Sequence, residues 1–207
     1  MQTYLVGGAV RDQLLGRHVR ERDWVVVGAT ERDMRGRGFR QVGSDFPVYL
    51  HPETGEEYAL ARTERKQGRG HKGFDWQVGS EVTLEDDLRR RDLTINAMAR
   101  NSDNGLIDPY GGCNDLASKI LRHVSDAFSE DPLRVFRVAR FAATFPDFTV
   151  EKETAELMRT MVKELADLPA ERIWMEWTKA ADQTAPWRFF ATLHEVGARQ
   201  PWFDDID

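Results

Sequence analysis

The stretch LVGGAVRDQLLGRHVRERDWVVVG (residues 5–28) places a Gly-Gly pair after one apolar run and two acids just before another. TYLVGG (residues 3–8) predicts a short strand that ends in glycines, and DWVVVG (residues 23–28) predicts a second strand. Between them, AVRDQLLG (residues 9–16) has helical spacing, with Gly16 as a C-terminal cap. This order indicates a domain that mixes α and β structure.

The two acids, Glu21 and Asp23, stand at positions i and i+2, where strand side chains point to the same side with Cα atoms about 7 Å apart. Carboxylates so placed can reach one or two hard cations, and Mg²⁺ prefers oxygen ligands shared with substrate phosphates. The alternative is that the two acids are solvent-exposed polar residues at the start of a strand and bind no metal, because an acid-x-acid pair is common. The glycines favour the metal, because without a Cβ their backbone N–H groups can approach a phosphate.

The rest of the first half continues the mixed pattern. TERDM (residues 30–34) predicts a capped helix, and PVYLHPETGEEYALAR (residues 47–62) predicts a β-hairpin. The glycine-rich and basic residues 63–80 predict a loop. TLEDDLRRRD (residues 83–92) and TINAMAR (residues 94–100) predict two helices, and LIDPYGG (residues 106–112) predicts a strand end followed by a tight turn.

From Glu130 onward the pattern is almost wholly helical, with apolar residues three and four apart in PLRVFRVARFAATF (residues 132–145). We therefore expect two domains, 1–125 and 126–207. Trp174, Trp177 and Trp187 are expected to lie in the helical core.

Bulk composition limits the setting of the protein. The chain of 207 residues has a net charge of −6 and no apolar run of the roughly 20 residues that span a bilayer. Its single cysteine, Cys113, cannot form an internal disulfide, so we expect an inert thiol, a cytoplasmic location and no membrane. The net charge alone does not suggest nucleic acid, but basic residues cluster at 62–72, 89–91 and 134–140.

Five segments together resemble a known family. They are residues 5–28, EDDLRRRDLTINAMA (residues 85–99), DPYGG (residues 108–112), EDPLRVFRVARF (residues 130–141) and ERIWME (residues 171–176). In this order they resemble the polymerase-β-type nucleotidyltransferases, and more closely the bacterial tRNA nucleotidyltransferase and poly(A) polymerase family. The resemblance implies an α+β fold: a nucleotidyltransferase head with a mixed sheet flanked by helices, followed by an all-α neck and partial body.

The resemblance also implies roles for residues of the head. Glu21 and Asp23 match the catalytic acid pair that binds Mg²⁺, although the family usually has Asp at the first position. Glu57 stands where a third carboxylate belongs, with the adjacent Glu56 as the alternative. The remaining matches concern the nucleotide: Gly8 and Arg11 for its phosphates, Arg91 for its ribose, and Asp92 and Asn96 in the same motif as Arg91.

The helix after Glu130 is where the family reads the incoming base. Asp131 and Arg134 are three apart on the expected helix, so their side chains share a face and offer an acceptor beside a planar fork of donors. Arg137 and Arg140 continue along an adjoining stripe that suits a triphosphate or the tRNA end. The alternative is an intrahelical salt bridge on a solvated surface.

The function implied is addition of CCA, from CTP and ATP, to the 3′ end of tRNA. The basic segment 62–76 favours addition of the terminal A. The alternatives are a poly(A) polymerase or A-adding enzyme of the same family, and a non-catalytic nucleotide- or RNA-binding protein. Bacterial relatives have about twice this length, so the usual C-terminal half is missing. No histidine precedes an aspartate, so no phosphohydrolase activity is expected, and the oligomeric state stays open.

Overall fold

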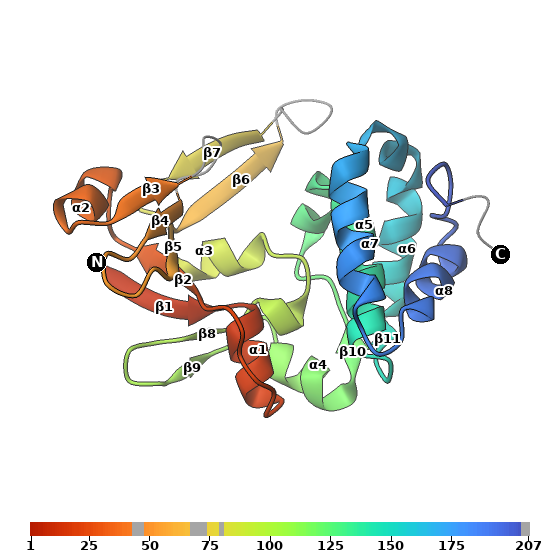
Figure 1. Cartoon of the computed structure of the whole chain (residues 1–207), viewed down its shortest axis with the longest axis horizontal. Helices are drawn as coiled ribbons and strands as arrows, with labels where there is room; N and C mark the ends of the chain where they lie inside the picture. The colour runs from red at the N-terminus through yellow and green to blue at the C-terminus, as the bar shows by residue number, and fades with distance from the viewer. Residues whose placement is uncertain (43–47, 67–73, 79–80, 204–207) are drawn as a thin grey trace. The chain divides into compact units, whose positions relative to one another are not determined.

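The computed structural model describes residues 1–42, 48–66, 74–78 and 81–203. Contacts between Cα atoms divide the chain into two units. The first contains Met1–Arg65 and Asp75–Cys113, and the second contains Lys66–Phe74 and Asn114–Asp207. In Figure 1 the first unit runs from red to green and the second from green to blue.

The first unit is built on a seven-stranded sheet with the order β3-β4-β5-β2-β1-β8-β9. Strands β2 and β5 run parallel, and the other neighbouring strands run antiparallel. The predicted mixed sheet is therefore confirmed. The strands are β1 (Gln2–Val6), β2 (Asp23–Val27), β3 (Arg40–Val42), β4 (Val48–Leu50), β5 (Glu57–Leu60), β8 (Ala99–Arg100) and β9 (Leu106–Ile107).

The helices of the first unit include α1 (Gly8–Leu14) and α3 (Leu84–Arg89), which carry motif residues, and α2 (Glu31–Gly36), which packs on the sheet through Met34. Helices α2 and α3 both begin with a capping box, in which Thr30 bonds with Asp33 and Thr83 bonds with Asp86. Each box satisfies backbone N–H groups that have no partner within a helix, which explains why these short segments are helical. The capped helix expected from residue 30 is confirmed.

The core of this unit lies against β2 and its neighbours. Val26, Met34, Tyr49 and Leu60 form one buried cluster that joins strands β2, β4 and β5 to helix α2. Burying an apolar side chain of this size stabilises a fold by about 1.5–3 kcal/mol. The cluster therefore fixes the pairing of β2 with β5.

Two expectations for this unit are wrong. In the segment expected as a loop, β6 (Arg62–Lys66) and β7 (Phe74–Val78) pair as a two-stranded sheet, while residues 67–73 and 79–80 lie outside the described residues. In the segment expected as a second helix, Thr94–Asn96 forms a single 3₁₀ turn, η1. Strand β8 follows and pairs with Leu5 and Val6 at the end of β1, so sheet formation overrides the helical pattern there.

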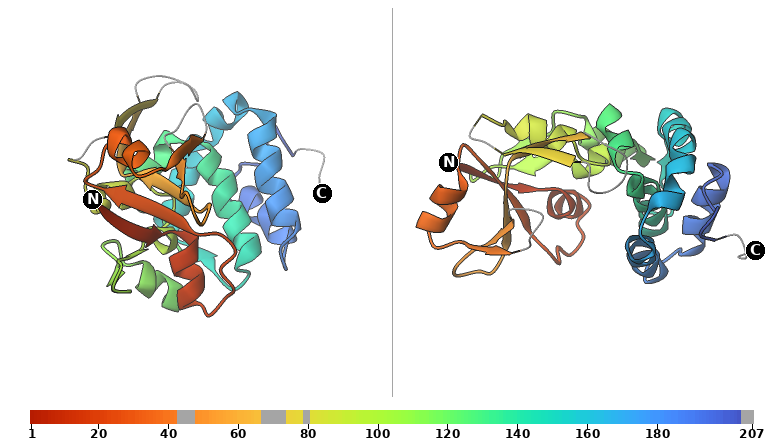
Figure 2. Two further views of the ribbon diagram at one scale, coloured as in Figure 1. Left: turned by 60° about the vertical axis from the view of Figure 1, so that its left-hand side comes forward. Right: turned by 90° about the horizontal axis from the view of Figure 1, so that it is seen from above.

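The second unit is mainly helical, as expected. Helix α5 (Leu133–Thr144) packs against α7 (Ala170–Ala181) and α8 (Trp187–Glu195), and Phe136 on α5 stacks on Phe189 of α8. These helices are the cyan and blue ribbons of Figure 2. Helix α4 (Gly112–Ser118) begins in the first unit and ends in the second. The second unit also contains η2 (Asp126–Glu130), α6 (Lys152–Met161), η3 (Val162–Asp167) and the short parallel strands β10 (Ile120–Leu121) and β11 (Thr149–Val150).

None of the helices in the described part of the chain combines the length and apolar character needed to cross a membrane.

Candidate active site

The pairing of β2 with β5 places two carboxylates side by side. Asp23 and Glu57 are direct partners in the parallel register, at the first residue of each strand. Neighbouring strands lie about 4.8 Å apart, and paired residues point to the same face of the sheet. On the other side of β2, Asp23 pairs with Val6, which immediately precedes Gly7. The acids therefore lie at the same edge of the sheet as the Gly-Gly turn.

The choice between Glu56 and Glu57 follows from the hydrogen bonds. The Glu56 carboxylate accepts from Trp24 Nε1 at 3.0 Å and from Arg22 Nη1 at 3.3 Å. These bonds hold Glu56 beside Arg22 and Trp24, whereas the strand register pairs Glu57 with Asp23. Glu57 is thus the residue placed to act with Asp23, and its catalytic role stays a prediction.

Electrostatics connect Asp23 with both Glu21 and Arg91. Burial raises the pKa of Asp23, the Arg91 guanidinium lowers it, and the Glu21 carboxylate raises it, with a net rise. Glu21 lies just before β2 rather than within it, yet it is close enough to Asp23 to affect its ionisation. Two carboxylates that repel each other favour a bound divalent cation.

The donor set fits Mg²⁺. A cleft of about 360 Å³ is lined by residues 19–23 and 54–57, which include Glu21, Asp23 and Glu57. Within the described ranges, no group of three or more His, Cys, Asp or Glu side chains is placed to hold a metal ion, so Glu21, Asp23 and Glu57 do not form a preformed cage. Mg²⁺ does not need such a cage, because it commonly takes one or two carboxylates and completes its shell with water and substrate phosphates.

A buried chain of hydrogen bonds joins the Gly-Gly turn to the later Arg-Arg-Asp motif. Arg11 Nη1 donates to Asn96 Oδ1 at 2.7 Å, and Asn96 Nδ2 donates to Asp92 Oδ1 at 3.0 Å. Arg11 also pairs with Asp12 at 2.9 Å. A Cβ on Gly8 would lie 3.4 Å from Arg11 Nη2, so Gly8 packs closely on this guanidinium. The structure therefore brings Gly8, Arg11, Asp92 and Asn96 together.

Arg91 lies against the same turn. Gly7 has φ +69°, and a Cβ at this position would be 2.8 Å from Arg91 Nη1. The same nitrogen donates to the Asn96 carbonyl at 3.4 Å. The other terminal nitrogen of Arg91 donates to Asp87 at 3.2 Å. We did not predict a role for Asp87 from the sequence, although the spacing of Asp87, Arg90 and Arg91 at i, i+3 and i+4 is that of helical ion pairs.

The expected base-reading pair belongs to the second unit, and its geometry differs from the expectation. Asp131 precedes α5 instead of lying on it, with Oδ1 accepting from Leu133 N at 3.1 Å and Oδ2 accepting from Arg172 at 3.0 Å. Arg134 is buried and donates to the Ala127 carbonyl at 2.6 Å. The proline between Asp131 and the helix explains the shift, because the residue before proline is disfavoured in α conformation.

Arg137 and Arg140 both face Glu176, a buried carboxylate on α7. Arg140 Nε donates to Glu176 at 2.5 Å, and its guanidinium lies 4.2 Å from the centre of the Phe141 ring. Arg137 lies farther from Glu176, at 3.9 Å, and its side chain is 35% exposed. Arg140 therefore connects α5 to α7, and Arg137 is the more accessible of the two.

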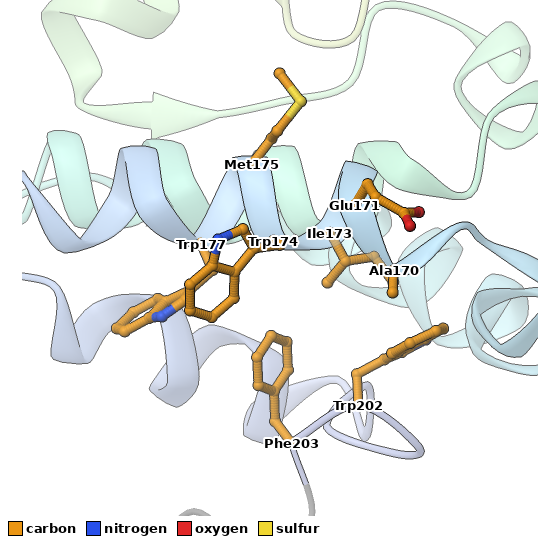
Figure 3. A pocket seen from close by; sticks show the side chains of 8 residues that line it. All are labelled: Ala170, Glu171, Ile173, Trp174, Met175, Trp177, Trp202 and Phe203. Atoms are coloured by element: carbon orange, nitrogen blue, oxygen red, sulfur yellow. The ribbon is translucent and has the colours of Figure 1, made fainter.

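The tryptophan expectation is wrong for two of three residues. Trp174 and Trp187 are 61% and 64% exposed, whereas Trp177 packs on Phe189 and Phe190. Trp174 and Trp177 lie on a groove of about 640 Å³, shown in Figure 3. Its other lining residues are Ala170, Glu171, Ile173, Met175, Trp202 and Phe203. Helix α7 buries Ile173, Glu176 and Ala180, so Trp174 lies off the buried face.

The Cys113 thiol shows no sign of activation. Burial and the nearby Asp108 raise the pKa of Cys113 to about 11. At neutral pH the group is therefore a thiol, which is a poor nucleophile.

Two family models match parts of the chain. Residues 3–122 match the family described as the poly A polymerase head domain. Residues 147–207 match a second family, described as the "probable RNA and SrmB-binding site of polymerase A".

Close relatives share most of this chain. The chain is 62% identical over 204 residues to a CCA-adding enzyme of Marinobacter nauticus, covering 97% of this chain and 55% of the relative. It is 60% identical over 209 residues to a multifunctional CCA protein of Aromatoleum aromaticum, covering 100% of this chain and 51% of the relative. The chain thus spans about half the length of the curated relatives it matches.

Solved structures agree with the fold. The Bacillus stearothermophilus CCA-adding enzyme in complex with CTP superposes with a TM-score of 0.78 at 30% identity, covering 95% of this chain and 48% of that one. The Thermotoga maritima CCA-adding enzyme in complex with tRNA gives a TM-score of 0.72 at 30% identity, covering 95% of this chain and 47% of that one. The chain therefore belongs to the poly A polymerase head domain family, in which its near relatives are CCA-adding enzymes.

Proposed function

We propose that this chain catalyses template-independent nucleotidyl transfer that adds CCA, from CTP and ATP, to the 3′ end of tRNA. The observation that carries the proposal is the pairing of Asp23 with Glu57 at the sheet edge where the Gly7–Gly8 turn begins. The identity of the relatives, and the CTP, ATP and tRNA complexes of the similar structures, support the choice of substrates.

Glu21 and Asp23 are proposed to hold Mg²⁺, with Glu57 as the third carboxylate of the site. When bound, the metal activates the attacking 3′-hydroxyl and neutralises charge on the leaving pyrophosphate. Glu21 is one methylene longer than the Asp usual at this position, and it keeps the charge that the site needs.

The cationic residues are proposed to orient the nucleotide. Arg91 presents a guanidinium beside Asp23 and the Gly7 turn, where it can meet the ribose or phosphates. Gly8 and Arg11 shape the turn, and Asp92 and Asn96 hold Arg11 in place through the buried hydrogen bonds.

Asp131 and Arg134 are proposed to select the base, and Arg137 to contact the phosphates or the tRNA end. Asp131 is held by Arg172, and Arg134 is held by the Ala127 carbonyl, so both side chains are ordered by their own unit. Pre-ordered polar groups lose less entropy on binding, which suits a template made of protein. Arg140 is proposed to support this surface through Glu176.

The nearest alternative is a poly(A) polymerase or A-adding enzyme, because the matched head family is named for poly A polymerase. A non-catalytic RNA- or nucleotide-binding protein is the alternative from another class. The first would add A without using CTP, and the second would bind nucleotide without releasing pyrophosphate.

The test is primer extension on tRNA that lacks its 3′ CCA, with Mg²⁺ and with CTP alone, ATP alone or both. We expect two additions with CTP alone and three with both nucleotides. Asp23→Ala and Glu21→Ala are expected to abolish extension. Undiminished extension by both variants would refute the metal assignment, and extension with ATP alone beyond three residues would favour the poly(A) alternative.

A matched pair tests the third carboxylate. Glu57→Gln is expected to lower kcat by at least about 100-fold, the scale expected when a group that acts on the transition state is lost. Glu56→Gln removes the neighbouring charge on the opposite side of the strand and is expected to change kcat less than about 3-fold. Equal losses in the two variants would contradict the assignment of Glu57.

A further inference from the structure

Asp87 is the most deeply buried carboxylate near the candidate site. Its side chain has no exposed surface, although it lies on the short helix α3 among charged neighbours. Burying an ionised carboxylate costs several kcal/mol unless charged partners offset the loss of water. Such a group needs an explanation beyond helix formation.

The partners of Asp87 are two guanidinium groups and one backbone amide. Oδ1 accepts from Arg90 Nη2 at 2.7 Å and Nε at 3.1 Å, and Oδ2 accepts from Arg91 Nη2 at 3.2 Å. The backbone N of Arg62, the first residue of β6, donates to Oδ1 at 3.4 Å. One carboxylate therefore connects α3, the start of β6 and Arg91.

These contacts hold Arg91 from one side. From the other side, Arg91 Nη1 donates to the Asn96 carbonyl and lies 2.8 Å from where a Cβ on Gly7 would be. A free arginine side chain loses rotamer entropy when a ligand fixes it, so fixing its planar group in advance strengthens any ligand contact that it makes.

We propose that Asp87 is a positioning residue that fixes the Arg91 guanidinium beside Asp23 and the Gly7 turn, so that the nucleotide meets a pre-oriented arginine. The inference rests on the proposed nucleotidyl transfer, and it adds a residue that acts only through Arg91. Its direct consequence is that Asp87 and Arg91 contribute to nucleotide affinity as one unit.

The experiment is a double-mutant cycle on the dissociation constant of CTP with Mg²⁺, measured by calorimetry on the full chain. Asp87→Asn keeps the shape but removes the charge, and it is expected to weaken CTP binding about 10-fold, the scale of a lost charge-assisted hydrogen bond. Arg91→Ala is expected to weaken binding at least as much. The double variant is expected to bind CTP like Arg91→Ala alone, because the proposed effect of Asp87 on the nucleotide is exerted through Arg91.

Two further variants separate positioning from stability. Arg90→Gln removes the other guanidinium partner and is expected to lower the melting temperature while changing CTP affinity less than about 3-fold. Asp87→Glu keeps the charge but moves the carboxylate by one methylene, so it is expected to fold and to weaken CTP binding by an intermediate factor. If Asp87→Asn does not fold, Asp87→Glu carries the test.

The outcomes are distinct. Unchanged CTP affinity in folded Asp87→Asn or Asp87→Glu, or fully additive losses in the cycle, would overturn the positioning role while leaving the proposed function intact. A wild-type chain that neither binds CTP nor extends tRNA would refute the proposed function and this inference with it.

Discussion

Gly7 and Gly16 both have a positive φ, of +69° and +64°. A Cβ on Gly7 would meet Arg91 at 2.8 Å, whereas no described atom lies within 4 Å of the same position on Gly16. An L-residue would therefore be strained at either position, but only a side chain at Gly7 would also contact Arg91.

This contrast gives a prediction. Gly7→Ala and Gly16→Ala are each expected to destabilise the fold by about 1–2 kcal/mol, because an L-residue is strained at positive φ. Gly7→Ala should also displace Arg91 and weaken CTP binding by at least about 10-fold. Urea unfolding and calorimetry measure the two effects, and equal CTP affinity in the two variants would contradict the placement of Arg91.

The ionisation of Asp87 makes stability depend on pH. Burial raises the pKa of Asp87, but Arg90 and Arg91 outweigh it and bring the pKa below the ordinary value of 3.8. A carboxyl with a depressed folded-state pKa contributes stability above its unfolded pKa and loses it as the pH falls through the folded pKa. Below pH 4 the wild-type free energy of unfolding should therefore fall more steeply than that of Asp87→Asn. Urea unfolding from pH 2.5 to 7 checks this, and parallel profiles would contradict it.

At the scale of residues, the sequence predicted motifs that lie within one short stretch but not contacts between residues distant in the chain. The acid pair, the glycines and the Arg-Arg-Asp motif were visible as patterns because each occupies one short stretch. The partners of Asp131 and Arg140 were not visible, since Arg172 and Glu176 lie 41 and 36 residues away. The burial of Asp87 depends on Arg62 and on the packing of α3, and no local pattern reports either.

At the scale of elements, the sequence predicted the helices whose stability depends on interactions within one segment. The capping boxes of α2 and α3 and the apolar spacing of α5 act within one segment, so these helices were predicted. Strands β6 and β7 were missed because the glycine-rich composition of residues 63–80 favoured one loop over two paired strands. The helix expected over 94–100 was wrong because β8 gains a partner in β1.

Helix α7 offers an element-scale prediction through its two neighbouring tryptophans. Trp177 contacts Phe189 and Phe190 of α8, with ring centres 5.4 and 4.6 Å away, whereas Trp174 is 61% exposed. Trp177→Ala is expected to cost about 3 kcal/mol through the cavity it leaves. Trp174→Ala is expected to cost less than about 1 kcal/mol. Thermal unfolding of both variants compares them, and a larger loss for Trp174→Ala would contradict the packing of α7.

At the scale of the whole molecule, the chain contains a head unit and a helical unit and spans about half of its relatives. The mixed sheet and the helical second half were predicted, because strand alternation and helical spacing are properties of long stretches. The assignment of metal binding to the head unit and of base selection to the helical unit was implied by family resemblance and stays a prediction.

The parallel pairing of β2 with β5 has a consequence for natural variation among related chains. A one-residue insertion or deletion inside β5 would either bring Glu56 or Tyr58 opposite Asp23 or, with Glu57 kept opposite Asp23, turn the later side chains of the strand to the other face. The turn between β4 and β5 carries no such constraint, since added residues there leave the strands in place. Related sequences should therefore vary in length before Glu56 and keep strict spacing from Glu57 to Leu60.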